Sequence, residues 1–268
     1  MTAKRGLDTV YDAVLFDMDG VVTDTAAVHA ATWKQLFDQV LSDSRARPAA
    51  SGTPFDERED YLRYVDGRSR EDGISAFLRS RGMEVERGEL DDPPEAWTLM
   101  GFATPKNNIF RAMLKKRGLR AFPGTTALLG RLRDAGVLVG VVTASRNASE
   151  MLATAGLTAL FDTVVDGQDA IDRGLPGKPD PAMFLEAARR LGVSPSRTAV
   201  VEDAVAGVTA AHQGGFGLVV GVDRQGRRHE FEVAGAHIVV GDVSELDLGV
   251  SITDPWVLVY RGFDPLHE

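Results

Sequence analysis

Short apolar runs that end in turn-forming or charged residues recur along the chain, separated by segments with helical periodicity. The runs cover residues 13–16, 137–142, 161–165, 198–201, 216–220 and 238–240. Runs of this length that are apolar throughout predict strands buried on both faces, as in a parallel sheet covered by helices. Because helices alternate with these strands from residue 122 onward, the sequence predicts an α/β fold.

Between residues 28 and 118 the chain has helical periodicity and no strand-like run of this kind. Asp24 or Thr25 can cap the first helix of this stretch. We therefore predict two domains. Residues 1–27 and 119–268 form a core built on the parallel sheet, and residues 28–118 form a helical cap inserted after the first strand.

Two further helix starts are indicated by their capping residues. Ser69 lies three residues before Asp72, which is close to a capping box. Asp180 is predicted as an N-cap, with Pro181 as the first helical residue, since the first turn does not need the N–H that proline lacks. Residues 42–54 are polar and rich in Ser, Arg, Pro and Gly, which predicts a loop.

Composition and charge narrow the possible functions. The chain has 268 residues, 44% hydrophobic and 26% charged, as in ordinary soluble proteins, and a net charge of −9 that argues against a nucleic-acid partner. The absence of cysteine excludes disulfides, thiolate zinc sites and cysteine nucleophiles. The start of the chain lacks the apolar segment of a signal peptide, and the run 137–142 is too short to span a membrane. We expect a cytoplasmic protein with no membrane partner.

Pairs of carboxylates follow two of the predicted strands. Asp17 and Asp19 come directly after the first strand, and Glu202 and Asp203 follow the run 198–201. Ligands of parallel sheets bind beyond the carboxyl ends of the strands, and like charges placed there are costly without a cation or a shared proton. Each pair alone could cap a turn or a helix. Two such pairs favour a Mg²⁺ site, because Mg²⁺ prefers oxygen ligands.

Other polar residues are expected near these carboxylates. Thr143, Ser145 and Asn147 follow the run 137–142 and can donate to an anion, although an ordinary hydroxyl-containing turn would use the same residues. Lys178 precedes a proline in a restricted segment that suits phosphate binding, although most lysines are solvated.

Together these residues suit phosphoryl transfer. A carboxylate can attack phosphorus and form an aspartyl-phosphate. A second carboxylate two residues further on can act as acid and then as base. A lysine, a hydroxyl group and Mg²⁺ can neutralise the charge on the phosphoryl oxygens.

With these motifs in this order, the chain resembles the haloacid dehalogenase superfamily of phosphotransferases. The motifs are Asp17-Met18-Asp19-Gly20, Thr143, Lys178-Pro179 and Glu202-Asp203. The resemblance implies a Rossmann-like core with Asp17 as nucleophile, Asp19 as general acid and base, and Thr143 and Lys178 as catalytic partners. It also implies Mg²⁺ bound by Asp17, the carbonyl of Asp19 and Asp203, with Glu202 assisting.

Within that superfamily the chain is most similar to the β-phosphoglucomutase family. The similarity rests on residues 23–25, 67–72, 106–107, 143–147 and 202–207, together with His29 and Trp33. It implies a substrate-binding set of Thr25, His29, Trp33, Arg70, Lys106, Ser145 and Asn147. In that family the arginine at the position of Arg70 binds the distal phosphate, and the residues matching His29 and Lys106 couple cap closure to Asp19. The chain departs from the family pattern in two places. It has a longer insert around residues 45–55, which bears on whether the cap closes, and it has Thr143 where a serine is common.

The implied function is an isomerase that interconverts β-D-glucose 1-phosphate and glucose 6-phosphate through an aspartyl-phosphate and β-glucose 1,6-bisphosphate. The alternative is a Mg²⁺-dependent phosphatase of small sugar phosphates, and a third possibility is a regulatory domain beside a phosphorylase. Residues 254–265 resemble the opening strand of inverting disaccharide phosphorylases, which release β-glucose 1-phosphate, although an ordinary tail strand fits them equally. A disaccharide phosphorylase is therefore a candidate partner through this C-terminal tail.

Overall fold

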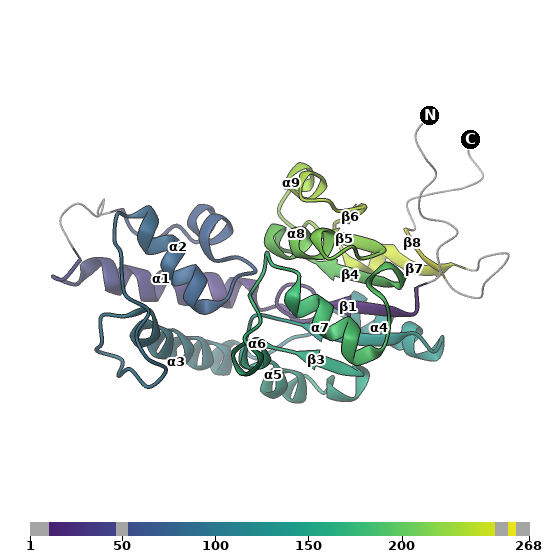
Figure 1. Ribbon diagram of the computed structural model, residues 1–268, viewed down its shortest axis with the longest axis horizontal. Coiled ribbons are helices and arrows are strands. Elements are labelled where there is room, and N and C mark those ends of the chain that lie inside the picture. Colours follow the sequence, from purple (N-terminus) through teal and green to yellow (C-terminus); the bar gives the residue numbers. More distant parts are fainter. Residues whose placement is uncertain (1–10, 47–52, 250–256, 261–268) are drawn as a thin grey trace. The chain divides into compact units, whose positions relative to one another are not determined.

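The computed structural model describes residues 11–46, 53–249 and 257–260 (Figure 1). Its internal contacts divide the chain into two compact units, Met1–Asp24 with Arg120–Glu268 and Thr25–Leu119. We call these the core unit and the helical unit. The predicted domain breaks, after residues 27 and 118, correspond to breaks after residues 24 and 119.

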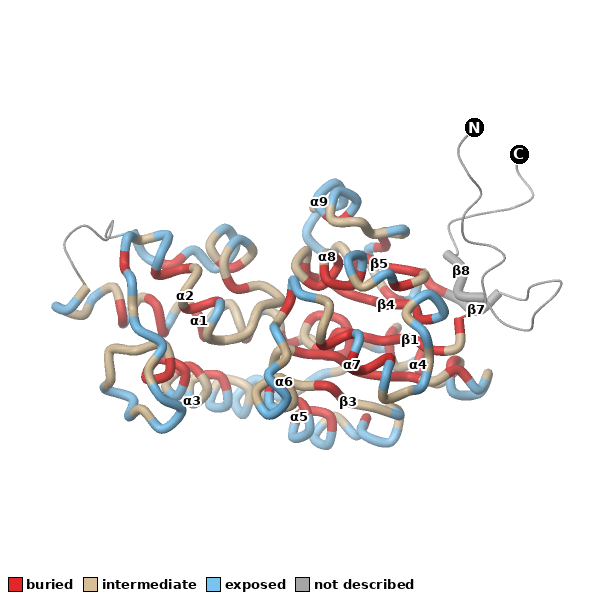
Figure 2. Tube along the Cα trace, viewed as in Figure 1, coloured by how far each residue is buried: buried red, intermediate tan, exposed pale blue. Residues whose placement is uncertain are grey.

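The core unit contains a six-stranded sheet in which every neighbouring pair is parallel, with the strand order β3-β2-β1-β4-β5-β6. The strands are β1 (Ala13–Phe16), β2 (Leu138–Val142), β3 (Thr163–Val165), β4 (Thr198–Glu202), β5 (Leu218–Val222) and β6 (Ile238–Val240). Figure 2 shows β1, β4 and β5 buried along their length, as the apolar runs predicted. The predicted α/β class is confirmed.

The strand pairing places β1 between β2 and β4. Phe16 at the end of β1 pairs with Val141 of β2 and with Val201 of β4. The carboxyl ends of β1, β2 and β4 therefore lie side by side, so the residues that follow them meet at one edge of the sheet.

Helices and short turns connect these strands. They are α4 (Pro123–Asp134), α5 (Ala148–Thr154), α6 (Gly167–Arg173), α7 (Ala182–Leu191), α8 (Val205–Gln213) and α9 (Arg228–Val233), with 3₁₀ turns η2 (Thr158–Leu160), η3 (Pro195–Arg197) and η4 (Val243–Glu245). Phe184 of α7 and Val208 of α8 belong to one buried cluster with Leu15 and Val200 of the sheet. Apolar burial of this kind is the main contribution to the stability of the fold.

Two details of these helices differ from the prediction. The sequence analysis missed α6, whose start is a capping box formed by Asp166 and Asp169. The predicted N-cap at Asp180 was wrong, because α7 begins one residue later with Pro181 as its N-cap. Asp180 still contributes, since its Oδ1 accepts from the amide of Ala182 at 2.9 Å in a local turn.

In the described residues of the helical unit, three helices and one π-helical turn pack around aromatic side chains. The elements are α1 (Ala26–Ser42), η1 (Tyr61–Val65), α2 (Arg70–Ser80) and α3 (Leu99–Arg117). The ring of Phe37 lies 4.0 Å from that of Phe77 and 5.2 Å from that of Trp33, between ring centroids. Ser69 caps α2 as predicted, accepting from the amide of Asp72 at 3.1 Å.

The C-terminal part of the chain adds a small second sheet to the core unit. Strand β7 (Leu246–Gly249) pairs antiparallel with β8 (Val257–Tyr260). The predicted tail strand therefore exists over 257–260, while residues 254–256 and 261–265 lie outside the described part, as do residues 47–52 of the predicted loop. Within the described ranges, no helix is long and apolar enough to cross a membrane.

Candidate active site

The site begins with a compact turn that follows β1. The carbonyl of Met18 accepts from the amides of Val22 and Thr23 at 2.9 and 2.8 Å, and from the hydroxyl of Thr23 at 3.1 Å. The amide of Gly20 donates to the carbonyl of Thr23 at 2.7 Å. These bonds hold Asp17 and Asp19 at the carboxyl edge of the sheet.

Two glycines leave space for the carboxylates that follow β4. Gly20 has a φ of 95°, and a Cβ there would lie 1.8 Å from Oδ2 of Asp203. A Cβ on Gly207 would lie 1.7 Å from Oε1 of Glu202. Larger residues at these positions would displace the carboxylates, so both glycines are required by close approach.

Lys178 connects the ends of three strands. Its Nζ contacts Oδ1 of Asp17, donates to Oε1 of Glu202 at 2.5 Å and donates to the carbonyl of Val142 at 3.3 Å. The side chain is fully buried, and its ammonium lies 4.9 Å from the ring centroid of Phe184. All three N–H donors thus have an acceptor, as a buried ammonium requires.

The pKa values of Lys178 and Asp17 are both raised, but for different reasons. Burial alone lowers the pKa of Lys178, but the carboxylates of Asp17 and Glu202 outweigh it and raise the pKa, which keeps the amine charged. Burial raises the pKa of Asp17 well above its ordinary value; Lys178 opposes that shift, and Glu202 and Asp19 add to it. One ammonium therefore leaves an excess of buried negative charge that a divalent cation would balance.

Asp17, Glu202 and Asp203 form a group whose carboxylate oxygens lie within 4.8 Å of one another. Hard oxygen donors of this kind fit Mg²⁺. Both oxygens of Glu202 are already engaged, with Oε1 bound to Lys178 and Oε2 accepting from the amide of Ala204 at 2.8 Å. This fits an orienting role for Glu202 beside Asp17 and Asp203.

Thr143 and Asp19 are brought together across the ends of β2 and β1. Oγ1 of Thr143 lies 3.4 Å from Oδ2 of Asp19 and accepts from the amide of Ser145 at 3.0 Å. The hydroxyl of Ser145 accepts from the amide of Asn147 at 3.2 Å. The hydroxyl-containing turn left open by the sequence is therefore present, and the anion-binding role of Ser145 and Asn147 stays a prediction.

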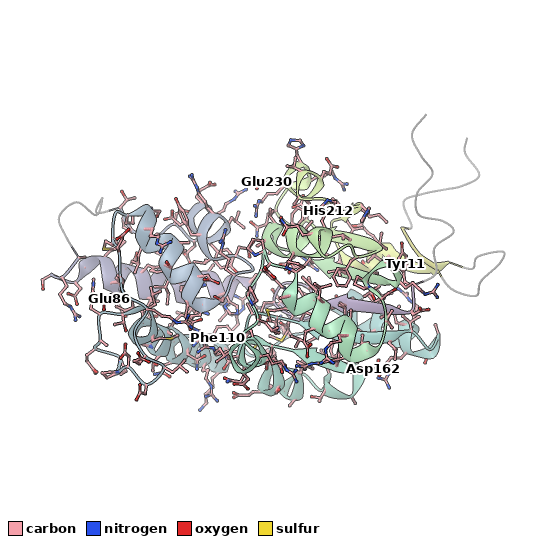
Figure 3. All side chains as sticks on the ribbon, viewed as in Figure 1. Tyr11, Glu86, Phe110, Asp162, His212 and Glu230 are labelled. Carbon is pink, nitrogen blue, oxygen red and sulfur yellow. The ribbon has the colours of Figure 1, made fainter. Side chains whose placement is uncertain are left out.

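The remaining predicted residues form two groups within the helical unit. Nζ of Lys106 lies 3.1 Å from Nδ1 of His29 and 4.7 Å from the ring centroid of Trp33. The ring of His29 stacks on Phe110, which Figure 3 labels, at 4.3 Å between centroids. Lys106 is 5% exposed, so this cation is held in an aromatic surrounding rather than in solvent.

Arg70, at the start of α2, forms the second group. Its guanidinium donates to the carbonyl of Ala103 at 3.2 Å and to Oδ1 of Asn107 at 3.1 Å, both on α3. Thr25 is fully buried at the N-cap position of α1, and its side chain makes no capping bond there. The roles predicted for these residues in substrate binding stay predictions.

The sequence analysis gave no role to Gly207, which it included only in the segment 202–207, and it did not name Arg224. Gly207 provides clearance for Glu202, and Arg224 contacts the carbonyl of Gly20. The position of Arg224 two residues after β5, at the same edge of the sheet, is a signal that could have indicated it.

Comparisons with known proteins identify the family of this chain. The haloacid dehalogenase-like hydrolase family model matches residues 11–215. A Mycobacterium bovis protein named beta-phosphoglucomutase is 42% identical over 90% of this chain and 93% of its own length. The crystal structure of β-phosphoglucomutase from Clostridium difficile is 25% identical, has a TM-score of 0.69, and covers 89% of this chain and 94% of that one.

A longer relative matches the same region. An uncharacterized glycosyl hydrolase of Mycobacterium tuberculosis is 33% identical over 89% of this chain, which corresponds to 18% of that protein. In that relative, a segment similar to this chain is therefore part of a much larger polypeptide.

Proposed function

Because the chain belongs to the haloacid dehalogenase superfamily and is an enzyme of the β-phosphoglucomutase-like type, we propose that it interconverts β-D-glucose 1-phosphate and glucose 6-phosphate. The proposed route passes through an aspartyl-phosphate and β-glucose 1,6-bisphosphate. Membership establishes activity of the phosphotransferase or phosphatase type, and the proposal names the sugar phosphates and the intermediates.

In the proposed reaction Asp17 attacks the phosphorus at C1 of the bisphosphate while Asp19 protonates the departing C1 oxygen of glucose 6-phosphate. The bond from phosphorus to that oxygen breaks as the bond to the Asp17 carboxylate forms. Asp19 then takes the proton from the 6-hydroxyl of β-glucose 1-phosphate as that hydroxyl attacks the aspartyl-phosphate, which forms the bisphosphate again and frees Asp17. The contact of Lys178 with Oδ1 of Asp17 supports this assignment, because it orients the carboxylate and leaves its second oxygen for attack.

We propose Mg²⁺ as the metal of this site, held by Asp17, Asp203 and the carbonyl of Asp19, with Glu202 in support. When bound it supplies positive charge that offsets the charge of the phosphoryl oxygens. Lys178 provides a second, fixed positive charge, and the hydroxyl of Thr143 lies within reach of Asp19.

A mutase also needs a binding place for the phosphate that is not being transferred. Arg70 is our candidate, because a guanidinium can bind phosphate bidentately and loses less hydration than an ammonium. Its bonds to Ala103 and Asn107 hold the side chain before substrate arrives, which lowers the entropy cost of binding.

One observation favours the mutase over the phosphatase: the chain is 42% identical, over 90% of its length, to a protein named beta-phosphoglucomutase. A match of that length includes most of both the core unit and the helical unit. The test offers β-glucose 1-phosphate with Mg²⁺ and a trace of the bisphosphate, and measures glucose 6-phosphate against free phosphate. We expect glucose 6-phosphate in excess. Free phosphate as the only product would overturn the mutase and support the phosphatase.

We also propose that the C-terminal tail associates with an inverting disaccharide phosphorylase. The support is the glycosyl hydrolase relative, in which a segment similar to this chain belongs to a larger polypeptide. Sedimentation of the full chain with such a phosphorylase, with and without residues 250–268, tests this. Association that requires the tail is expected, and equal sedimentation of both forms would contradict it.

A further inference from the structure

Arg224 joins the loop after β5 to the turn that carries Asp17 and Asp19. Its Nη1 contacts the carbonyl of Gly20, and its Nη2 donates to Oδ2 of Asp242 at 3.1 Å. The guanidinium lies over the ring of Phe122, 3.9 Å from the centroid. Its side chain is 26% exposed, so most of the group is enclosed by these three contacts.

The partners of Arg224 are themselves held in place. Oδ1 of Asp242 accepts from the amide of Ser244 at 2.9 Å within the capping box of η4. A guanidinium is a rigid planar fork, so an acid on one side and a ring on its face fix the direction of its remaining N–H groups. Arg224 can therefore hold the carbonyl of Gly20 at a defined position.

Gly20 lies in the turn after β1 and packs against Asp203, one of the carboxylates of the proposed metal site. Its Cα faces the carboxylate of Asp203, since a Cβ on Gly20 would lie 1.8 Å from Oδ2 of that residue, and Asp203 and Arg224 line the same small pocket. The amide of Gly20 donates to the carbonyl of Thr23. Because a peptide unit is planar, this bond also fixes the direction of the Asp19 carbonyl.

We infer that Arg224 is a positioning residue for the metal site. It holds Gly20 by the carbonyl while Asp203 packs against the Cα, so that the Asp19 carbonyl and the carboxylates of Asp17 and Asp203 keep their arrangement despite their mutual repulsion. This inference rests on the Mg²⁺ site of the proposed function. It goes beyond that site because the described hydrogen bonds of Arg224 go to Gly20 and Asp242, neither of which is a proposed metal ligand.

A purely electrostatic role would have the opposite sign. A positive charge near a cation site repels the cation, so removal of the charge alone would tighten Mg²⁺ binding. Loss of positioning weakens it, since removal of a group that orients ligands costs roughly 10- to 100-fold in metal affinity. The direction of the change therefore separates the two roles.

The experiment is calorimetric titration of the full chain with Mg²⁺ alone, without substrate. We expect Arg224→Ala to weaken Mg²⁺ binding at least about tenfold. Arg224→Gln, which keeps an N–H donor but no charge, should lie between Arg224→Ala and wild type. The matched control is Arg197→Ala, which removes an arginine paired with Asp12 at the other end of β1 and should bind Mg²⁺ as wild type does.

Unchanged or tighter Mg²⁺ binding by folded Arg224→Ala, with normal binding by wild type, would overturn this inference and leave the proposed function intact. Failure of wild type to bind Mg²⁺ would overturn the metal assignment and this inference together. If Arg224→Ala does not fold, Arg224→Lys decides. It keeps the charge but cannot bind Gly20 and Asp242 with one planar fork, so wild-type affinity in that variant would also overturn the inference.

Discussion

At the scale of single residues, the ammonium of Lys178 has the most demanding environment in the site. It is fully buried and bound to groups at the ends of β1, β2 and β4. Buried charges are tolerated only when paired, and removing one partner leaves the others uncompensated. Lys178 therefore contributes to the local structure as well as to the proposed chemistry.

Asp17→Asn is expected to abolish turnover, because an amide oxygen cannot form the aspartyl-phosphate. Binding of fluoroberyllate or another phosphate mimic should be lost as well. The matched control is Asp12→Asn, which changes an aspartate at the opposite end of β1. Turnover of Asp17→Asn within about tenfold of wild type, or roughly 1.4 kcal/mol of barrier, would remove Asp17 from the nucleophile role.

Arg70→Ala is expected to reduce mutase flux by about 100-fold or more, since a lost charge-assisted bidentate contact costs several kcal/mol. Hydrolysis of a small substrate with one phosphate should change much less. Both rates are measured on the same preparation, and Arg68→Ala, two residues away with the same charge, is the control. If the two rates of Arg70→Ala fall together, Arg70 does not serve a second phosphate.

At the scale of elements, α6 and α7 are joined by a network of charged side chains. Arg190 of α7 donates to Oδ1 of Asp169 on α6 at 2.5 Å and to the carbonyl of Val164 on β3 at 2.7 Å. Glu186 accepts from Arg189 at 2.7 Å and from Arg190 at 2.9 Å. The network holds the segment between β3 and β4, which also carries Lys178.

The hydrogen bonds from Arg189 and Arg190 lower the pKa of Glu186 to about 2, from an ordinary value of 4.5. A lowered pKa means that its contribution to stability is complete above pH 4.5 and is lost as the pH falls from 4.5 toward 2. We expect Glu186→Gln to lower the melting temperature at pH 7, and the difference from wild type to shrink across that window.

Melting curves of wild type and Glu186→Gln from pH 7 to pH 3 provide this measurement. Glu232→Gln, a change at an exposed position of α9, controls for the loss of one carboxylate elsewhere. A difference between wild type and Glu186→Gln that stays constant with pH would contradict the ionic role of Glu186.

At the scale of the whole molecule, the proposed Mg²⁺ site would link folding of the core unit to cation binding. Asp17, Glu202 and Asp203 come from two different strand ends, and they meet only in the folded chain. A ligand that binds only the folded state stabilises it by mass action, by about 2.7 kcal/mol at a concentration 100 times its Kd.

Mg²⁺ is therefore expected to raise the melting temperature as well as the activity. Asp203→Ala should abolish most of that rise, because it removes one proposed ligand. Asp172→Ala, a change on α6 at an aspartate that is not part of the carboxylate group, should keep it. Full activity in excess chelator, or an equal rise in all three proteins, would be incompatible with a metal at this site.

The sequence by itself determined the class of the fold and the set of chemical groups. Apolar runs such as 13–16 and 198–201 are typical of strands buried on both faces in a covered parallel sheet, and the structure confirms them as β1 and β4. Acidic pairs after those strands indicated a cation site, because strand ends in such sheets meet at one edge. Helix α6 was missed because its short segment has a capping signal but little apolar periodicity.

Tertiary structure alone decided which groups touch. Lys178 lies 161 positions from Asp17 in the chain, and its three acceptors come together through the pairing of β1 with both β2 and β4. The same packing brings Gly20 against Asp203 and Gly207 against Glu202, where a side chain would not fit. It also brings Arg224 into contact with the carbonyl of Gly20. Local periodicity records which face of an element is buried, but not which distant residue packs against it, so these contacts follow only from the folded arrangement.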